Sequence, residues 1–526
     1  MSFQTRLLSS NDTSIDPGMG QDDTPSDALP DLLQFNSLDP QRYPFLLSST
    51  ASRENNTQYD ILLACPRYQL TLNADKTLDL SAGDSGVGID NSAGFLDNLE
   101  NLYLAESRQD NLADEGDSAT RQSSSENLPF TGGWFVYLSY EIAEEIEPCL
   151  SLPGAHINQP RAVAVRCPAA IIIDKANGRC IAIAEDSYSE LLDDIEEDFD
   201  TIQNLTRLSA MQPQADQLEK VSLLSLHEAD PAPYLAQVEK IKSYIIDGDI
   251  FQANLSRPWR ATLDEDIEDA DLFRSLSANN PSSFAALATL SSMSIISSSP
   301  ERLVSLRDNI VETRPIAGTR PRHSDQLSDE ALAKELLDHP KEQAEHIMLI
   351  DLERNDLGRV CKPGSIEVDE LMTLESWEHV HHIVSNVRGE LREDKSPIDV
   401  LRAVFPGGTI TGCPKVRCIE ILAEMEQEAR GAYTGSLGYI NLDGSMDFNI
   451  LIRTMVRQGR EITFRAGGGI VSDSIAEREL EETRAKAKGL LKIFSVDHAS
   501  NDPGKVSMGS SKETDLHEAP GEDEIQ

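Results

Sequence analysis

Short apolar runs recur through the first half of the chain. They have the length and the composition of β-strands, being rich in Ile, Val, Leu, Ala and aromatic residues. The runs cover residues 59–65, 133–140, 162–174 and 180–184. We therefore expect the first half to be built mainly from strands.

The second half mixes helical and strand patterns. Apolar residues recur at helical spacing over 235–245, and Gly248 is placed to end that helix. A strand pattern follows at 251–257, and later strand-like runs are joined by Asp-Gly and Gln-Gly hairpin signals. These later runs cover 433–440, 446–456 and 461–466. Antiparallel strands alternating with helices predict an α+β fold with large sheets.

Polar segments interrupt these patterns. Residues 1–30, a stretch near 108–127 and residues 497–526 have a polar composition typical of disorder. We expect the first and the last, which is acidic, to be disordered tails, and the middle one to be a mobile insertion. The remainder is expected to form an N-terminal domain at 31–215 and a second, more regular domain at 225–495.

The chain is strongly acidic. Asp and Glu number 90 against 46 Lys and Arg, which gives a formal net charge of −44. Such a charge repels phosphates, so no nucleic-acid partner is expected. No apolar run has the length of a membrane span and the N-terminus lacks a signal-peptide pattern, so no membrane partner is expected. Seven scattered cysteines without C-x-x-C spacing favour a reducing, cytoplasmic setting.

Two distant acidic segments carry paired glutamates. Glu342 and Glu345 stand three residues apart, and the pair Glu479 and Glu482 repeats this spacing after a run of three glycines. On helices each pair projects from one face, which for a single pair is usually a solvated surface. Two such faces brought together would form a carboxylate cluster. Mg²⁺ suits such a cluster, because it binds oxygen ligands and keeps positions for water and substrate.

Four further features accompany the acidic pairs. A rigid basic segment covers 313–322, and a histidine stands beside a β-branched strand at 380–385. A Gly- and Pro-rich loop at 405–415 opens a helix, an arrangement suited to an anion. Arg453 interrupts an apolar strand pattern, so its side chain must find a carboxylate or face outward.

Together these features resemble the chorismate-utilising enzyme family, which includes component I of anthranilate synthase and of aminodeoxychorismate synthase, and isochorismate and salicylate synthases. The resemblance is close over about 230–495 and looser before it, where 43–49 and 129–133 carry it. It implies a two-subdomain chorismate-binding fold with large antiparallel sheets packed against helices. The N-terminal domain would be similar to that of anthranilate synthase component I, and 225–495 would be the chorismate-binding catalytic domain.

The resemblance also implies metal and substrate groups. Glu345 and Glu482 would bind Mg²⁺, with Glu342 and Glu479 close behind, and the ion would hold the ring carboxylate of chorismate. Thr409 would line the ring pocket. The groups implied for the enolpyruvyl carboxylate and its surroundings are Tyr433, Arg453, the backbone of Gly467 and Gly469, and Lys486. Lys486 also follows Glu482 by four residues, a spacing typical of an ordinary surface ion pair.

Two residues are implied to carry proton chemistry. Glu301 would be the general acid that protonates the departing 4-hydroxyl, which requires a carboxyl pKa raised by burial or by neighbouring carboxylates. His382 would lie under the ring and assist removal of the C2 proton in members that eliminate pyruvate.

Two positions separate family members by nucleophile. Water-using members resemble one another in a lysine at the position of Gln252, and an amide cannot act as a base for water, so ammonia is the expected nucleophile. Many aminodeoxychorismate synthases have a lysine, thought to attack C2, at the nucleophile position that Ala317 occupies here. With alanine at this position, the chain is similar to anthranilate synthases. Alanine also removes the covalent nucleophile from the mechanism.

Other segments favour aminodeoxychorismate synthase. Residues 410–418, 448–453 and 479–486 look more like members of that group that carry alanine, and Ser48 replaces the glutamate of the Leu-Glu-Ser signature of tryptophan-inhibited anthranilate synthases. We therefore expect Mg²⁺-dependent amination of chorismate to 4-amino-4-deoxychorismate, in para-aminobenzoate and folate biosynthesis. Anthranilate synthesis is the alternative. A non-catalytic chorismate-binding subunit is a more remote one, because it would be expected to have lost at least one of the implied catalytic or metal residues.

The chain shows no glutaminase motif of its own. No cysteine stands in a Gly-x-Cys-x-Gly elbow of the kind that holds the nucleophile of a glutamine amidotransferase. We therefore expect a separate class I glutamine amidotransferase subunit to supply ammonia to this chain.

Overall fold

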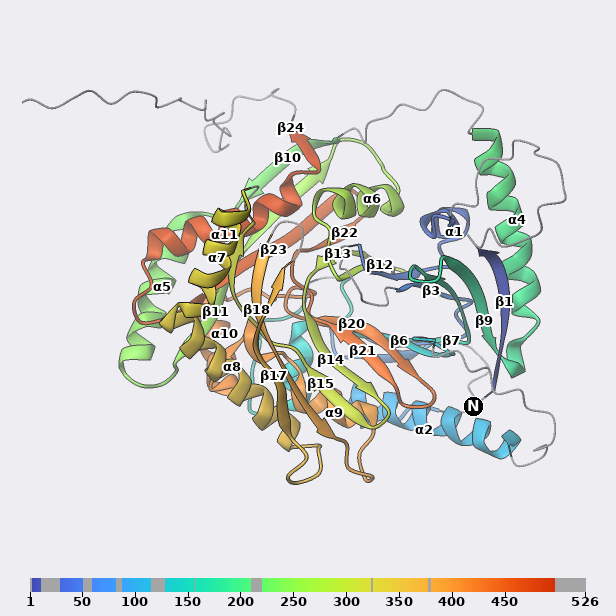
Figure 1. The fold of residues 1–526 in the computed structure, drawn as a ribbon, viewed down its shortest axis with the longest axis horizontal. Coiled ribbons are helices and arrows are strands. Elements are labelled where there is room, and N and C mark those ends of the chain that lie inside the picture. The colour runs from blue at the N-terminus through green and yellow to red at the C-terminus, as the bar shows by residue number, and fades with distance from the viewer. Residues whose placement is uncertain are drawn as a thin grey trace, which may run out of the picture.

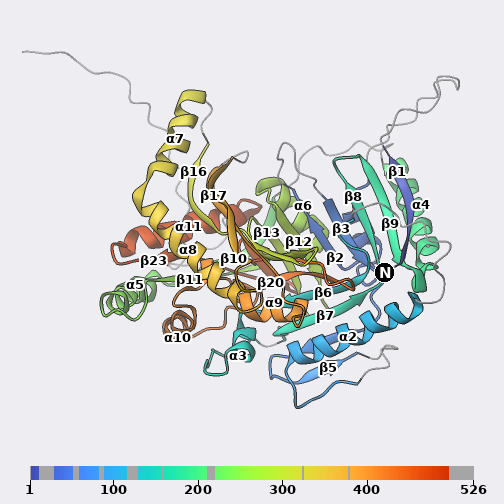
Figure 2. The same ribbon diagram turned by 60° about the horizontal axis from the view of Figure 1, so that its bottom comes forward.

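The protein, seen in a computed structural model, is a sandwich of two large sheets with helices on its outer faces (Figures 1 and 2). This architecture confirms the predicted α+β class with large antiparallel sheets. The described part of the chain contains no helix long and apolar enough to cross a membrane. The structure describes residues 2–10, 29–50, 59–81, 88–114, 128–156, 158–209, 220–322, 325–376 and 380–496.

The larger sheet has 13 strands within the described residues, all antiparallel to their neighbours except the β10–β24 pair. A two-residue strand, β19 (Gly412–Cys413), pairs with β11 outside the main order. The main order is β1 (Phe3–Ser10), β9 (Arg179–Glu185), β8 (Ala169–Asp174), β3 (Tyr59–Ala64), β2 (Phe45–Ser48), β12 (Phe284–Thr289), β13 (Ser294–Ser299), β22 (Thr454–Gln458), β23 (Glu461–Ile470), β11 (Gln252–Leu263), β10 (Val221–Glu228) and β24 (Phe494–Val496).

The smaller sheet has 11 strands within the described residues, and β17 (Glu367–Ser376) pairs with β18 outside its main order. The main order is β16 (Ile316–Pro321), β18 (Val380–Glu390), β15 (Ile310–Thr313), β14 (Arg302–Arg307), β21 (Met446–Asn449), β20 (Ser436–Asn441), β6 (Gly133–Leu138), β7 (Ala162–Cys167), β4 (Gln69–Leu72) and β5 (Leu78–Leu80).

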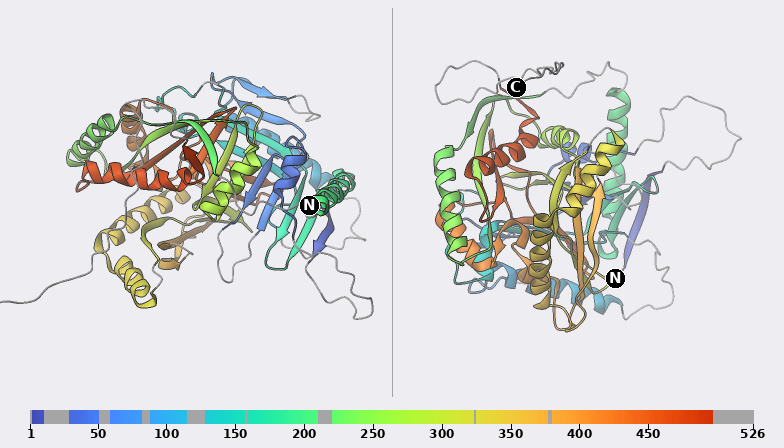
Figure 3. Two further views of the ribbon diagram at one scale, coloured as in Figure 1. Left: turned by 90° about the horizontal axis from the view of Figure 1, so that it is seen from above. Right: turned by 60° about the vertical axis from the view of Figure 1, so that its left-hand side comes forward.

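Three groups of helices cover the sheets. The red α11 and the green α5 lie side by side in both views of Figure 3, and with α10 they pack on β11 and β23. A second group packs at the other end of the larger sheet, and a third on the smaller sheet. The first group is α5 (Pro231–Ile246), α10 (Lys415–Glu426) and α11 (Ala476–Leu491). The second group is α1 (Leu33–Leu38), α4 (Leu191–Ser209) and α6 (Asp269–Asn279). The third group is α2 (Phe95–Asp114), α7 (Gln326–Asp338), α8 (Pro340–Gly358) and α9 (Pro397–Val404), with the short α3 (Ala143–Ile146) beside them.

An apolar core fills the space between the two sheets. Phe45 of the larger sheet and Phe135 of the smaller sheet stack at 3.8 Å between ring centroids, and both are buried. Burial of a side chain of this size contributes roughly 1.5–3 kcal/mol. The contacts therefore tie the two sheets into one body.

The division into two domains does not separate two cores. Each sheet takes strands from both 31–215 and 225–495, and the core between the sheets contains residues of both ranges.

Two expectations of disorder also need correction. Residues 3–10 form β1, which pairs with the edge of β9, and α2 continues to Asp114, inside the expected insertion. The rest of the two expected tails and of the insertion lies almost wholly outside the described residues.

Several described segments cross from one sheet to the other, and two of them, called the crossing segments below, position the candidate site. Pro300 and Glu301 lead from β13 of the larger sheet to β14 of the smaller one. Residues 450–453 lead back from β21 to β22. The single strand expected at 446–456 is therefore two strands in different sheets. Arg453 lies in the crossing segment at φ +51°, and not in mid-strand as its apolar neighbours indicated.

Candidate active site

The two crossing segments are hydrogen-bonded to each other. The Ile450 amide donates to the Glu301 carbonyl at 3.0 Å, and the Ser299 hydroxyl donates to the Ile450 carbonyl at 2.5 Å. Ser299 and Glu301 are buried. The backbone that carries Glu301 is thus fixed by the backbone that leads to Arg453.

Glu301 has the features of a proton donor. Its side chain is 8% exposed, and Oε1 accepts a hydrogen bond of 2.7 Å from the Thr409 hydroxyl. Burial raises the pKa of the Glu301 carboxyl to about 7, against the lowering effects of Thr409 and of the positive charges of Lys486 and Arg453. A carboxyl of this pKa is about half protonated at neutral pH. The structure thus joins two residues, Glu301 and Thr409, that the sequence places 108 positions apart.

Arg453 presents a guanidinium without a hydrogen-bonded carboxylate among the described residues. Burial lowers the pKa of Arg453, and only the charge of Glu301 opposes this shift. The positive φ is unfavourable for a non-glycine residue, typically by about 1–3 kcal/mol. A desolvated cation held in such a conformation is suited to bind an anion.

His382 lies on β18 opposite an irregularity of β16. Its partner across the ladder is Thr319, and the register shifts between Ala317 and Thr319. The imidazole is 6% exposed, and burial, helped by the charge of Arg453, lowers the pKa of His382 to about 4. The ring is therefore neutral near pH 7 and able to accept a proton. Ala317 is buried on the neighbouring strand beside Ile383.

The first acidic pair lies at the start of α8. His339 caps the helix by accepting from the Glu342 amide, and the Glu342 carboxylate pairs with Arg320 at 3.5 Å. The Glu345 carboxylate accepts a hydrogen bond of 2.8 Å from the side-chain amide of Gln252. Gln252, singled out as the position that separates nucleophiles, thus touches a predicted metal ligand.

The second acidic pair lies on α11 above the three-glycine run of β23. A Cβ on Gly468 would lie 3.1 Å from a carboxylate oxygen of Glu482 and 3.6 Å from one of Glu479. The Lys486 ammonium pairs with Glu482 at 2.8 Å and donates to the Gly467 carbonyl at 2.9 Å. The i,i+4 ion pair that the sequence indicated is therefore present, and the same ammonium also contacts the glycine strand.

The glycine strand allows side chains to approach its backbone. A Cβ on Gly467 would lie 2.8 Å from the Tyr433 hydroxyl, and a Cβ on Gly469 would overlap the side-chain amide of Gln252. Tyr433 is 7% exposed and lies just before β20, and burial raises the pKa of its phenol to about 12. Glycine is thus required at these positions for close approach.

The four glutamates do not form one compact cluster. Within the described residues no three His, Cys, Asp or Glu side chains are arranged to hold a metal ion. Gln252 occupies one oxygen of Glu345, and Lys486 one oxygen of Glu482. The donor chemistry still fits Mg²⁺, because the carboxylates of Glu479 and Glu482 border Gly468, and Gln252, which borders Gly469, donates to the Glu345 carboxylate of the other helix.

Sequence reasoning missed a buried acid beneath the site. Glu353 falls in the apolar stripe of α8, one helical turn after Leu349 and Ile350, a position that could have marked it. It is 6% exposed, and burial with the charge of Asp356 raises the pKa of Glu353 to about 8.

Lys415 ends the 405–415 segment that the sequence suggested for an anion. Its ammonium pairs with Asp356 at 2.6 Å, so its charge is compensated within the protein.

Comparisons with known proteins identify the family of the chain. A family model described as chorismate binding enzyme matches residues 49–492. The anthranilate synthase component I-like protein of Synechocystis is 42% identical over 373 residues, 70% of this chain and 73% of that protein. The aminodeoxychorismate synthase component 1 of Bacillus subtilis is 48% identical over 259 residues, 49% of this chain and 55% of that protein.

A solved structure shows the same fold. The crystal structure of anthranilate synthase component I from Streptococcus pneumoniae matches with a TM-score of 0.68 and 30% identity, and the match covers 84% of this chain and 93% of that one. The chain therefore belongs to the chorismate binding enzyme family and is a chorismate-utilising enzyme.

Proposed function

We propose that this enzyme aminates chorismate to 4-amino-4-deoxychorismate, with ammonia as the nitrogen source and Mg²⁺ as the metal. The observation that carries the proposal is the buried carboxyl of Glu301, held by Thr409, with a pKa of about 7. Hydroxide is a poor leaving group, so loss of the 4-hydroxyl needs a proton donor at that oxygen. Glu301 is the group that supplies this proton.

The atoms balance without a further reactant. The C4–O bond of chorismate breaks, and the hydroxyl leaves as water with the proton of Glu301. The nitrogen of ammonia ends bonded to C4, and the proton lost from that nitrogen returns Glu301 to its acid form. The net change is replacement of a hydroxyl by an amino group with release of water.

The substrate carboxylates are proposed to occupy the positive side of the site. Arg453 offers a guanidinium without a carboxylate partner among the described residues, and the Tyr433 phenol, with its pKa of about 12, remains a hydrogen-bond donor at neutral pH. Lys486 adds a charge beside Gly467, and the backbone of Gly467 and Gly469 is open to close approach. These groups would bind the enolpyruvyl carboxylate.

The nucleophile is proposed to be ammonia because no base for water stands at the Gln252 position. The Gln252 side chain donates to Glu345, and an amide does not take a proton from water at neutral pH. Ammonia needs no such base.

The attack at C4 is supported by similarity. The 48% identity with the B. subtilis aminodeoxychorismate synthase component 1, over half of this chain, supports the 4-amino product. Anthranilate formation is the second candidate, favoured by Ala317 and by the relatives named for anthranilate synthase. In that reaction the neutral imidazole of His382 would take the C2 proton as pyruvate leaves.

Product analysis by mass spectrometry and fluorescence distinguishes these two reactions. The purified chain is given chorismate, Mg²⁺ and ammonium at alkaline pH, where free ammonia is present. We expect an amino product that keeps its enolpyruvyl group and gives 4-aminobenzoate when a lyase is added. Fluorescent anthranilate with released pyruvate would overturn the proposed product in favour of the second candidate.

Mg²⁺ is proposed to be held by Glu345 and Glu482, with Glu342 and Glu479 in support. Bound there, the ion would neutralise and orient the ring carboxylate of chorismate. We expect Glu345→Gln and Glu482→Gln to abolish Mg²⁺-dependent turnover and calorimetric Mg²⁺ binding, while circular dichroism stays unchanged. Glu481→Gln, on the same helix but paired with Arg484, is the matched control. Unchanged Mg²⁺ binding in both site variants would overturn the assignment.

We propose that a separate class I glutamine amidotransferase subunit supplies the ammonia. The chain is proposed to act in the cytoplasm. The designation component 1 or I in the names of the relatives supports a partner subunit. We expect the pure chain to use ammonium but not glutamine, and to use glutamine once a glutaminase subunit is added. Glutamine-dependent turnover by the pure chain would contradict this partner.

A further inference from the structure

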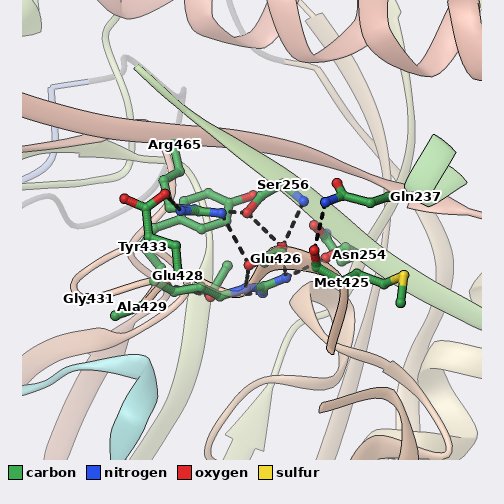
Figure 4. A network of polar contacts seen from close by, with 12 residues as sticks. Gln237, Asn254, Ser256, Met425, Glu426, Glu428, Ala429, Gly431, Tyr433 and Arg465 are labelled. Carbon is green, nitrogen blue, oxygen red and sulfur yellow. Dashed lines mark hydrogen bonds and ion pairs between the residues drawn. The ribbon is translucent and has the colours of Figure 1, made fainter. Parts of the chain in front are cut away.

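A buried ionic cluster lies behind the candidate site. Glu426, the last residue of α10, is the centre of the network in Figure 4. Its Oε1 accepts from the Ser256 amide and hydroxyl, both at 2.9 Å, and from Arg430 at 2.7 Å. Its Oε2 accepts from Arg430 at 2.9 Å and from Arg465 at 3.2 Å. Burial alone would raise the pKa of Glu426, but the two arginines outweigh burial and lower it, so the carboxylate is charged.

Arg430 has a partner for each of its five guanidinium hydrogens. Besides the two bonds to Glu426, it donates to the Asn254 carbonyl at 2.6 Å, to the Ile410 carbonyl at 3.3 Å and to the Thr434 hydroxyl at 3.2 Å. The guanidinium carbon also lies 5.7 Å from the centre of the Tyr433 ring. A guanidinium offers five donors in a rigid plane, whereas an ammonium offers three without fixed directions.

Each neutral acceptor belongs to a segment that carries a site group. Ile410 follows Thr409, which holds the Glu301 carboxyl. Thr434 follows Tyr433, whose hydroxyl faces Gly467. Asn254 lies on β11 two residues after Gln252, and its side-chain oxygen would be 2.9 Å from a Cβ on Gly467. One buried guanidinium therefore joins the acid side of the site to its carboxylate-binding side.

We propose that Arg430, held by Glu426, is a positioning residue that sets the distance between the Glu301–Thr409 acid and the Tyr433–Gly467 carboxylate site. This inference rests on the proposed function, because it takes Thr409 and Tyr433 as groups that face chorismate. Proton transfer to the 4-hydroxyl requires the substrate to be held by one side while the other delivers the proton. Misplacement by about 1 Å can lower a rate by about 100-fold.

Arg465 provides a matched control within the same cluster. It bonds to Glu426, to the Ser256 hydroxyl at 3.0 Å and to Glu428 at 3.5 Å. Within the described part of the chain, its guanidinium makes no hydrogen bond to Ile410 or to Thr434. Arg430→Lys and Arg465→Lys both keep the charge and both remove buried hydrogen bonds to Glu426. They differ in whether the lost bonds reach the site.

The test compares steady-state turnover, chorismate affinity and thermal unfolding of the full-length variants. With chorismate, Mg²⁺ and ammonium, we expect Arg430→Lys to lower kcat by about 100-fold and to raise KM for chorismate. Arg465→Lys is expected to keep kcat within about threefold of wild type, at a similar loss of thermal stability. Equal loss of kcat in the two variants, or wild-type kcat in Arg430→Lys, would overturn the proposal.

Two further measurements cover an unfolded Arg430→Lys variant and an inactive wild type. If Arg430→Lys does not fold, Thr434→Val removes one acceptor of the guanidinium with little change in shape, and we expect kcat to fall about fivefold. An unchanged kcat in that variant would overturn the proposal. If wild type forms no amino product, the proposed function fails, and calorimetric chorismate binding then decides the positioning role. Weaker binding by Arg430→Lys than by Arg465→Lys would support it, and equal binding would overturn it.

Discussion

Two regions of the molecule, the interior between the sheets and the two crossing segments, differ in how favourable the environment of their side chains is. Between the sheets, Phe45 stacks on Phe135, and the surrounding side chains are apolar and buried. At the crossing segments, Glu301 has a raised pKa and Arg453 has a positive φ and no carboxylate partner among the described residues. The first region stabilises the fold, and the second keeps unfavourable groups that the proposed chemistry would use.

The largest expected effect comes from removing the acid. Glu301→Gln keeps the shape and the acceptor for Thr409 but holds no transferable proton, so we expect kcat to fall by about 10²–10⁴-fold. Glu353→Gln is the control, since Glu353 is another buried carboxyl of raised pKa, placed beneath the site. Steady-state assays of both variants measure the contrast. Equal losses of kcat in the two variants would mean that turnover depends on a buried carboxyl in general and not on the carboxyl that contacts Thr409.

The next largest effect is expected at Arg453, whose guanidinium has no carboxylate partner in the described part of the chain. Arg453→Met should raise KM for chorismate by roughly 100-fold, about 2–3 kcal/mol for a charge-assisted pair. The thermal midpoint should not fall, because a desolvated charge without a hydrogen-bonded carboxylate among the described residues is removed. Arg302→Met is the control: Arg302 pairs with Asp447 at 2.8 Å, so its loss should lower the midpoint and leave KM unchanged. A drop in stability for Arg453→Met would show that the guanidinium has a structural partner.

The pH dependence is expected to be smaller and has a definite sign. Glu301 donates only when protonated, that is, below its pKa of about 7. At a fixed concentration of free ammonia, kcat should be level below about pH 6 and fall about tenfold per unit well above pH 7. Rates that rise through pH 8 at constant free ammonia would contradict a protonated Glu301.

The raised pKa of Glu301 also makes the free energy of unfolding depend on pH. Its folded pKa lies above the ordinary value of 4.5, so the native state binds more protons between about pH 4.5 and 7. The contribution of Glu301 is fully present below that window and is lost as the pH rises through it. Denaturant titrations of Glu301→Gln should lack this part of the pH dependence.

The smallest effect on turnover is expected in the apolar interior. Phe135→Ala should lower the free energy of unfolding by about 3–5 kcal/mol while kcat at low temperature stays within about twofold. Leu208→Ala, at a side chain 64% exposed, should change the unfolding free energy by no more than about 0.5 kcal/mol. Denaturant unfolding and parallel assays measure both. A large loss of kcat in folded Phe135→Ala would mean that the two regions are coupled.

Local sequence patterns predicted several local features of the candidate site. The i,i+3 glutamate pairs do lie on helices, Lys486 does pair with Glu482, and the three glycines do admit side chains close to the backbone. These features depend on helical spacing and on the missing glycine side chain, both of which a sequence displays.

Other features depend on tertiary structure. Apolar alternation does not encode which sheet a strand joins, so the break at 450–453 was not visible. The acceptors of Arg430 include the carbonyls of Asn254 and Ile410, and a backbone carbonyl has no residue type to mark it. The sharing of both sheets by 31–215 and 225–495 was not visible either, because a polar linker does not show whether its flanking strands share a sheet.

Infrared difference spectroscopy of wild type against Glu301→Gln measures directly whether Glu301 is protonated near neutral pH. We expect a protonated-carboxyl stretching band at pH 6, present in wild type and absent from the variant, that disappears by about pH 8. Subtraction of the variant removes the signals of other buried acids such as Glu353. A spectrum without this band at pH 6 would show that Glu301 is already ionised and would contradict its role as the acid.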